Sequence, residues 1–397
     1  MPGKETNNTV AVAAIWLCQA TTLTCSLLVT SIAGAVGTTL APAFALGTLP
    51  YSLFLVGTTL GMFPAFRIMM KVGRRLALIV GAGFGSAGGA VSLLAIGCSS
   101  FVLFSIGAFL LGTALAFTTF YRFAAVQLVA PTRQAHVHSA FVAGGLVASL
   151  AGPALASHTP FASSHLPQFG SYLMVAVLFL GTAVVMALIK RPEWTAAGTR
   201  SPFGAGHRPV QMGSRVLVLG TAANAVAAAS MTALMVALPI THHSHALAHV
   251  DTSLILQMHF LGMYLPGIVT GPLVNRLGIR PSIAAGGVMG LLGAVAGMAG
   301  NSSAHLIVAL VASGVSWALI AVASATAISR ASQPAMETRL GFYVSLSTAL
   351  VSLSIAGAIE VIGWLGVNAC VAVLFVGLFA LIAWSGRSQR DALPEPV

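Results

Sequence analysis

The sequence predicts an all-α membrane protein in which twelve transmembrane helices form two pseudo-symmetric six-helix bundles. Apolar residues make up 57% of the 397 residues and charged residues only 6%, too few charges to cover the surface of a soluble domain. Apolar runs long enough to cross a bilayer as helices follow one another along the chain. The basic residues fall between alternate runs, as they do in multi-pass proteins with a fixed orientation.

The twelve predicted spans are separated by polar segments or by segments that contain glycine and proline. In chain order they cover residues 10–35, 43–69, 75–98, 101–130, 136–157, 171–189, 214–240, 251–275, 281–300, 304–329, 338–362 and 366–385. The first run is too long for the apolar region of a typical signal peptide, and it has a counterpart at the start of the second half. We therefore interpret it as a helix that stays in the protein.

Basic residues predict the orientation. With the N-terminus in the cytoplasm, every Lys and Arg except Arg122 falls in a cytoplasmic segment or at the cytoplasmic end of a span. This predicts a multi-pass protein of the inner (plasma) membrane with both termini in the cytoplasm. The net charge of +11 is then a topology signal, and no nucleic-acid partner is expected.

The chain divides into two halves that repeat each other. Residues 190–213 are polar and basic and predict a cytoplasmic linker between an N-terminal bundle (1–189) and a C-terminal bundle (214–397). An offset near 205 residues relates Gly73 to Gly278 and Gln19 to Asn224. Two parallel six-helix repeats suit a transporter that works by alternating access, with its site between the halves.

A cytoplasmic motif after span 2 and again after span 8 makes the family recognisable. The second copy reads Gly271-Pro-Leu-Val-Asn275-Arg276-Leu-Gly278-Ile-Arg280, and the first reads Phe66-Arg67-Ile-Met-Met70-Lys71-Val-Gly73-Arg74-Arg75. Together with the two-half arrangement, they resemble the major facilitator superfamily and its signature G-x-x-x-D-R/K-x-G-R-R/K. The resemblance implies that the acidic position helps to latch the outward-facing state. Met70 cannot supply that charge, so we expect a weakened latch in the first half.

Span 5 carries a second family feature. Gly152-Pro153 lies among small residues, a pattern similar to that of drug:proton antiporters in the superfamily, and it slightly favours export. Ordinary close packing of helices explains small residues equally well. The string Tyr121-Arg122-Phe123-Ala124-Ala125 also resembles poorly characterised bacterial members, and that similarity names no substrate.

Polar and aromatic side chains inside the spans are the candidate substrate-binding residues, because the resemblance implies that spans 1, 2, 4, 5, 7, 8, 10 and 11 line the central cavity. Gln19, Thr22 and Ser26 share one face of span 1 at i, i+3 and i+7. The full candidate set is Gln19, Thr22, Ser26, Tyr51, Asn224, Gln257, Tyr264 and Trp317. Hydrogen bonds between helices are the alternative explanation for the polar members.

Arg122 is the one Lys or Arg that lies inside a span rather than at its cytoplasmic end, and no acidic residue of the sequence is expected to reach it. A guanidinium in a water-filled cavity is suited to bind a carboxylate or a phosphate, which points to an organic anion. Snorkelling to the cytoplasmic interface is the structural alternative.

Proton coupling has few candidates. The acidic residues near spans are Asp251 and Glu360, and His259 within span 8 titrates near neutral pH; all three lie toward the outer side. The His-rich segment 241–251 is loosely spaced and has no cysteine beside it, so no metal site is predicted there. No cofactor is expected either.

Together these features predict a secondary transporter that moves a small organic solute by alternating access, with export slightly favoured. Its partners are the solute, the lipid bilayer and, if coupled, protons, and one chain is sufficient as a monomer. A proton-coupled importer remains an alternative, and so does a transport-inactive sensor or partner protein on the same scaffold. The seven scattered acidic residues argue against an enzyme.

Overall fold

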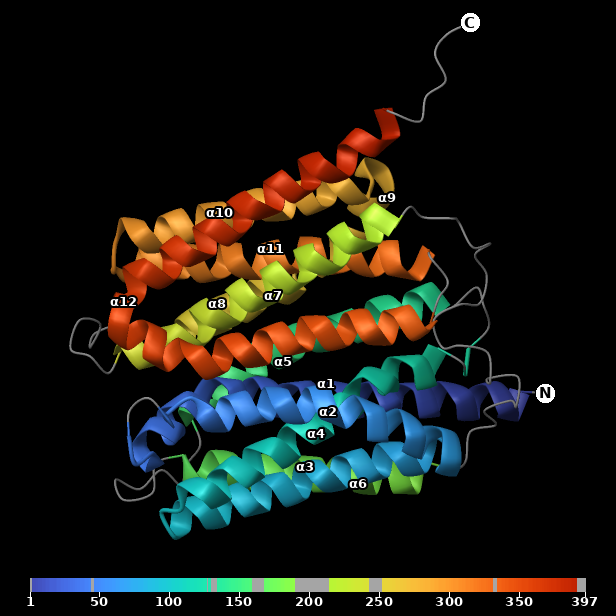
Figure 1. Cartoon of the computed structure of the whole chain (residues 1–397). Helices are drawn as coiled ribbons and strands as arrows, with labels where there is room; N and C mark the ends of the chain where they lie inside the picture. The colour runs from blue at the N-terminus through green and yellow to red at the C-terminus, as the bar shows by residue number, and fades with distance from the viewer. Residues whose placement is uncertain are drawn as a thin grey trace, which may run out of the picture. The chain divides into compact units, whose positions relative to one another are not determined.

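The computed structural model is helical throughout the part of the chain that it describes, and Figure 1 shows its helices in chain order. Residues 2–43, 46–126, 128–129, 134–158, 168–189, 214–242, 252–330 and 334–390 are described, so the predicted linker 190–213 lies outside them. The helices are α1 (Pro2–Leu40), α2 (Leu49–Val72), α3 (Arg74–Gly97), α4 (Phe101–Val126), α5 (Gln134–His158), α6 (Phe169–Leu188), α7 (Ser214–His242), α8 (Thr252–Tyr264), α9 (Gly267–Leu277), α10 (Ile279–Ala299), α11 (Ser303–Arg330) and α12 (Pro334–Arg390).

Ten helical stretches of the described chain are long and apolar enough to cross a membrane. The apolar part of α5 is a shorter stretch, Ala143–Ala156. The long helix α12 contains one apolar stretch from Gly341 to Ser385. Gly363, with φ 63° and ψ −176°, interrupts the helical geometry of α12, and Figure 1 shows the helix folding back as two arms. The chain is therefore a multi-pass membrane protein.

The predicted span 251–275 is not one continuous helix. It is divided into α8 and α9 at Leu265 and Pro266. Proline lacks the N–H that would continue the helical hydrogen bonds, and it restricts the residue before it. The next helix starts at once, because Thr270 N donates to the carbonyl of Pro266 at 2.9 Å.

Two glycines make equivalent turns in the two halves. Gly73 separates α2 from α3 with φ 83° and ψ 166°, and Gly278 separates α9 from α10 with φ 91° and ψ 170°. A positive φ is costly for a residue with a Cβ, which explains glycine at both points. The same backbone geometry therefore occurs twice, 205 residues apart.

The chain divides into two compact units. The first contains Met1–Pro202 together with Asp251–Phe260 and Ser352–Gly357. The second contains Phe203–Val250, Leu261–Val351 and Ala358–Val397.

In the first unit, α3 packs against α4 and α6, α2 packs against α4, and α1 packs against α5. The buried core near the α2–α3 turn includes Ile15, Leu78, Phe117, Tyr121 and Met186. Helices α2 and α4 approach so closely that a Cβ on Gly112 would lie 1.8 Å from the Phe54 carbonyl oxygen. Small residues allow this backbone approach between helices that have no hydrophobic driving force in lipid.

In the second unit, α11 packs against α7, α9 and α10. The indole N–H of Trp364 on α12 donates to the Gly297 carbonyl of α10 at 2.9 Å, and Asn368 lies beside Gly297. Near the C-terminal end of α12, the Arg215 guanidinium lies 5.1 Å from the centre of the Trp384 ring, a cation–π distance.

A row of glycines at matching positions shapes both α3 and α10. A Cβ on Gly85 would meet the Phe179 ring of α6 at 2.3 Å, and a Cβ on Gly290 would meet the Phe375 ring of α12 at 2.1 Å. The pairs Gly81/Gly286 and Gly88/Gly293 show the same repeat: the first glycines contact α4 and the second contact α11. These three pairs extend the 205-residue repeat into the interior packing of the two halves.

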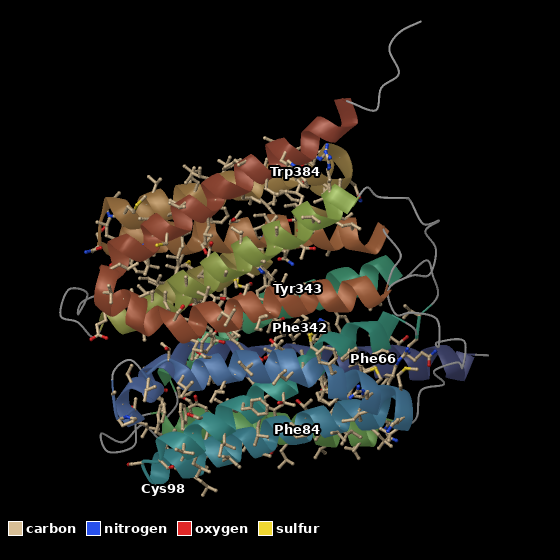
Figure 2. All side chains as sticks on the ribbon, in the orientation of Figure 1. Phe66, Phe84, Cys98, Phe342, Tyr343 and Trp384 are labelled. Carbon is tan, nitrogen blue, oxygen red and sulfur yellow. The ribbon has the colours of Figure 1, made fainter. Side chains whose placement is uncertain are left out.

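The outward-facing surfaces of the helices are apolar. Leu94, Val102 and Val373 are 65–69% exposed, and Phe66 and Tyr343, labelled in Figure 2, are about half exposed. Exposing this much apolar surface to water would cost free energy, whereas contact with lipid chains would not.

Candidate functional site

The polar face of α1 contains two kinds of side chain. Thr22 Oγ1 donates to the Gln19 carbonyl at 2.9 Å, and Ser26 Oγ donates to the Thr22 carbonyl at 2.9 Å. Both side chains are buried, and their hydroxyl protons are used within their own helix. Gln19 differs, because its Oε1 is buried and meets no hydrogen-bond partner among the described residues. Only part of the Gln19 residue is exposed.

Tyr51 near the start of α2 is a packed side chain. It is 4% exposed, and its ring lies 5.9 Å from the ring of Phe54. One residue further along the chain, Ser52 Oγ lies 3.0 Å from Ser352 Oγ, and both serines are buried.

Asn224 on α7 resembles Gln19 in the burial of its amide oxygen. Its Oδ1 is buried without a partner in the described chain, and the residue is partly exposed. One turn earlier, Thr221 Oγ1 donates to the Leu217 carbonyl at 2.8 Å. Ser347 of α12 reaches the neighbouring Ala225 carbonyl at 3.4 Å. Asn224 therefore belongs to the turn of α7 that α12 approaches.

The candidates on α8 lie in different surroundings. Gln257 Nε2 donates at 3.2 Å to the Leu150 carbonyl of α5, which lies three residues before Pro153. His259 is fully buried, with its ring 5.5 Å from that of Phe260. Tyr264 is partly exposed and is the last residue of α8 before the break at Pro266.

Trp317 is partly exposed on α11, directly after Ser316 and about one turn after Ser313. The hydroxyls of Ser313 and Ser316 are buried and meet no partner in the described chain. This helix therefore offers hydroxyl groups beside an aromatic side chain, a combination that can hold a ring with polar edges.

The remaining predicted residues are either exposed or outside the described part of the chain. Arg122 belongs to α4, but its side chain lies outside the described residues, as does Asp251. Glu360 is exposed on α12. Most of the His-rich segment also lies outside the described chain, and within that chain no three His, Cys, Asp or Glu residues form a group that could hold a metal ion.

The repeated motif at 66–75 and 271–280 has a structural role that the sequence pattern does not reveal. Arg75 Nε donates to the Met186 carbonyl at 3.0 Å, and its Nη2 donates to the Ala187 carbonyl. Arg280, which lies 205 residues later, donates in the same way to the Ser385 carbonyl of α12. Each arginine thus binds carbonyl groups near the C-terminal end of an apolar helix, where the helix dipole favours a cation. The repeat offset itself was the signal that could have paired the two arginines.

The remaining motif residues are placed as follows. Lys71 and Met70 are exposed near the end of α2, and Arg74 begins α3. Gly271, Asn275 and Arg276 lie in α9, the last two of them exposed.

Gly152 and Pro153 belong to α5, and Gly152 marks a close contact with α1. A Cβ on Gly152 would lie 2.8 Å from Leu27 Cβ and 3.2 Å from the Thr24 carbonyl oxygen. A Cβ on Gly357, which corresponds to Gly152 in the second half, would meet no described atom within 4 Å. Gly152 therefore has a packing role that its counterpart Gly357 does not share within the described chain.

Known proteins with similar sequences are membrane transporters. The chain is 30% identical over 379 residues to the riboflavin transporter RfnT of Brucella anthropi, covering 91% of this chain and 93% of that protein. It is 26% identical to the uncharacterized MFS-type transporter YdeG of Bacillus subtilis, over 85% of this chain and 83% of that protein. No family model matches the sequence.

Solved structures agree with this relationship at the level of the fold. An auto-inhibited POT family peptide transporter matches 97% of this chain and 98% of its own with a TM-score of 0.67, at 13% sequence identity. The helical fold, the repeated motif and the relatives matched over most of their length lead to one conclusion: the chain belongs to the major facilitator superfamily, and it is a transporter rather than an enzyme.

Proposed function

We propose that this protein is a secondary transporter that moves riboflavin, or a closely similar neutral heterocyclic solute, across the inner membrane by alternating access. The observation that carries the proposal is the 30% identity to a riboflavin transporter over 91% of this chain. Within the second unit, the partly exposed amide of Asn224 on α7 and the aromatic Trp317 on α11 are side chains of the kinds that such a solute needs.

The proposal includes twelve spans with both termini in the cytoplasm. Two observations support that count over the ten clear candidates. The 45-residue apolar stretch of α12 is about twice the length that one crossing needs, and it contains the interruption at Gly363. The apolar Ala143–Ala156 of α5 can supply the other span, together with its less apolar flanks.

A second candidate function is the transport of an organic anion, which Arg122 within α4 favours. Riboflavin and its phosphate ester, flavin mononucleotide, separate the two candidates because they share the flavin ring and differ in charge. The neutral-solute proposal requires transport of riboflavin that survives Arg122→Ala. The organic-anion candidate requires a preference for the phosphate ester that this substitution abolishes.

One transport assay with riboflavin tests both the direction of transport and its coupling to protons. The purified protein would be reconstituted into proteoliposomes, and the vesicles would be loaded with unlabelled riboflavin. The entry of radiolabelled riboflavin would then be followed with and without a pH gradient. We expect exchange in both conditions and net movement driven by the pH gradient only if protons are coupled. Of the candidate coupling residues, His259 is the one whose side chain the structure describes as buried. His259→Gln would abolish gradient-driven movement and leave exchange intact.

Export remains the favoured direction in this proposal, on the Gly152-Pro153 pattern alone, and a proton-coupled importer is its rival. The two are distinguished by the sign of the pH gradient that drives net riboflavin movement in oriented vesicles. A protein that binds riboflavin but exchanges none under any gradient would instead be a sensor on the transporter scaffold. Such a result would refute the transport proposal.

A further inference from the structure

One face of α2, close to its C-terminal end, carries positive charge and apolar surface side by side. Arg67 and Lys71 are exposed there, and next to them Phe66, labelled in Figure 2, is 49% exposed and Met70 is 60% exposed. At 3.6 residues per turn these four positions share about 140° of the helix surface. The opposite face is packed, because Ala65 is fully buried in the core of the first unit.

The two cations of this face have no counter-charge in the described part of the first unit. No hydrogen bond or ion pair joins Arg67 or Lys71 to another residue of the described ranges. Arg75 differs, because its guanidinium donates to carbonyls of α6. None of the acidic side chains that the structure describes belongs to this unit. The positive charge of Arg67 and Lys71 is therefore available to a negatively charged group from outside.

The position of this face along α2 places it at a membrane boundary. Both α2 and α3 are long and apolar enough to cross a membrane, and Gly73 separates them, so the turn at Gly73 lies at one membrane surface. Lys71 precedes Gly73 by two residues and Arg67 by six, which is about 3 and 9 Å along the helix axis. Long basic side chains at such depths extend toward the lipid headgroups.

The second unit does not repeat this combination. At the repeat offset of 205 residues, the four positions are occupied by Gly271, Pro272, Asn275 and Arg276, which supply one cation and no large apolar side chain. The superfamily signature has an acid where this chain has Met70. A carboxylate at that position would lie between the two cations and neutralise part of their charge. The departure from the signature at Met70 therefore leaves both charges of the first unit uncompensated.

We propose that this face of α2 binds an anionic phospholipid, with the phosphodiester held by Arg67 and Lys71 and an acyl chain lying against Phe66 and Met70. A guanidinium presents a fork of donors to phosphate oxygens, and an ammonium group adds a point charge. A zwitterionic lipid also has a phosphate, but the cation of its own headgroup is repelled by the two basic side chains. The inference makes no use of the proposed substrate, so it stands or falls independently of riboflavin transport.

The test measures lipid binding to delipidated protein in a neutral detergent by the ligand-induced shift in thermal unfolding. The probes are dioleoylphosphatidylglycerol, dioleoylphosphatidylcholine, which has the same acyl chains, and glycerol 3-phosphate, which has none. We expect the wild type to bind phosphatidylglycerol at least about ten-fold more tightly than either of the other probes, because two cations face its net charge. Equal binding of phosphatidylcholine would overturn the inference. Equal binding of glycerol 3-phosphate would show a site for a soluble anion and would overturn it as well.

Two matched substitutions locate the site. Met70→Asp adds a carboxylate between the two cations and should abolish the preference for phosphatidylglycerol, whereas Asn275→Asp adds the same charge at the equivalent, exposed position of the second unit and should preserve it. The double variant Arg67→Gln/Lys71→Gln should also lose the preference, without an added charge. Since all of these positions are exposed, the unfolding temperature of the lipid-free protein should stay nearly unchanged. An equal loss in Met70→Asp and Asn275→Asp would show a general attraction of a basic protein for anionic lipid and would refute the site.

Discussion

Replacing Arg75 with alanine should loosen the end of α6. The guanidinium donates to the carbonyls of both Met186 and Ala187, and hydrogen bonds from a charged donor contribute about 1.5–3 kcal/mol each when they are well protected. Arg75 is only partly buried, so competition from solvent reduces the expected total to about 2 kcal/mol. For a folding unit of about 200 residues, this lowers the unfolding temperature by roughly 4–8 °C.

The assay is thermal unfolding of the purified protein in one detergent, followed by tryptophan fluorescence. Arg75→Lys should recover only part of the loss, because an ammonium group lacks the planar fork that reaches two carbonyls at once. Lys71→Ala, at an exposed basic residue four positions before Arg75, is the matched control and should leave the unfolding temperature unchanged. If Arg75→Ala unfolds at the temperature of that control, the two hydrogen bonds contribute nothing and the interpretation of the motif is wrong.

Three further predictions use the same assay. Arg280→Ala should also lower the unfolding temperature, since it removes the hydrogen bond from Arg280 Nη2 to the Ser385 carbonyl, and an unchanged unfolding temperature would contradict a role for that bond. Gly290→Ala should cost about 1–3 kcal/mol because its Cβ would collide with the Phe375 ring, whereas Gly83→Ala on α3, which has open space around it, should be neutral or stabilising; equal effects would disprove the close contact. Trp364→Phe removes the bond to the Gly297 carbonyl and should cost about 1 kcal/mol, and an unchanged unfolding temperature would show that this bond adds no net stability.

The helical membrane fold was predictable because it depends on runs of residue types along the chain. Span ends were less predictable: α1 continues to Leu40, five residues past the expected end, and the predicted eighth span is broken at Pro266. The proline was visible in the sequence, but many membrane helices tolerate a proline when neighbouring groups satisfy the freed carbonyls. Only the three-dimensional packing decides between a bend and a break.

The candidate site was predictable as a set of helix faces, and the roles within it were not. Gln19, Thr22 and Ser26 form one pattern in the sequence, but the structure separates them: the two hydroxyls bond to their own helix and the amide oxygen does not. The difference arises because a hydroxyl one turn away reaches a helical carbonyl, whereas a longer amide extends past it. Similarly, no spacing rule indicates that Arg75 meets carbonyls 111 residues further along the chain.

The glycine rows of α3 and α10 have a consequence for motion. Where rings and backbone lie directly against a helix with no side chain between them, the partners cannot slide without collision, because there is no flexible group to adjust. Each of the helix pairs α3–α6 and α10–α12 should therefore move as a rigid body during the transport cycle. Bending is then left to helices interrupted by proline, such as α5 at Pro153 and the α8–α9 junction at Pro266.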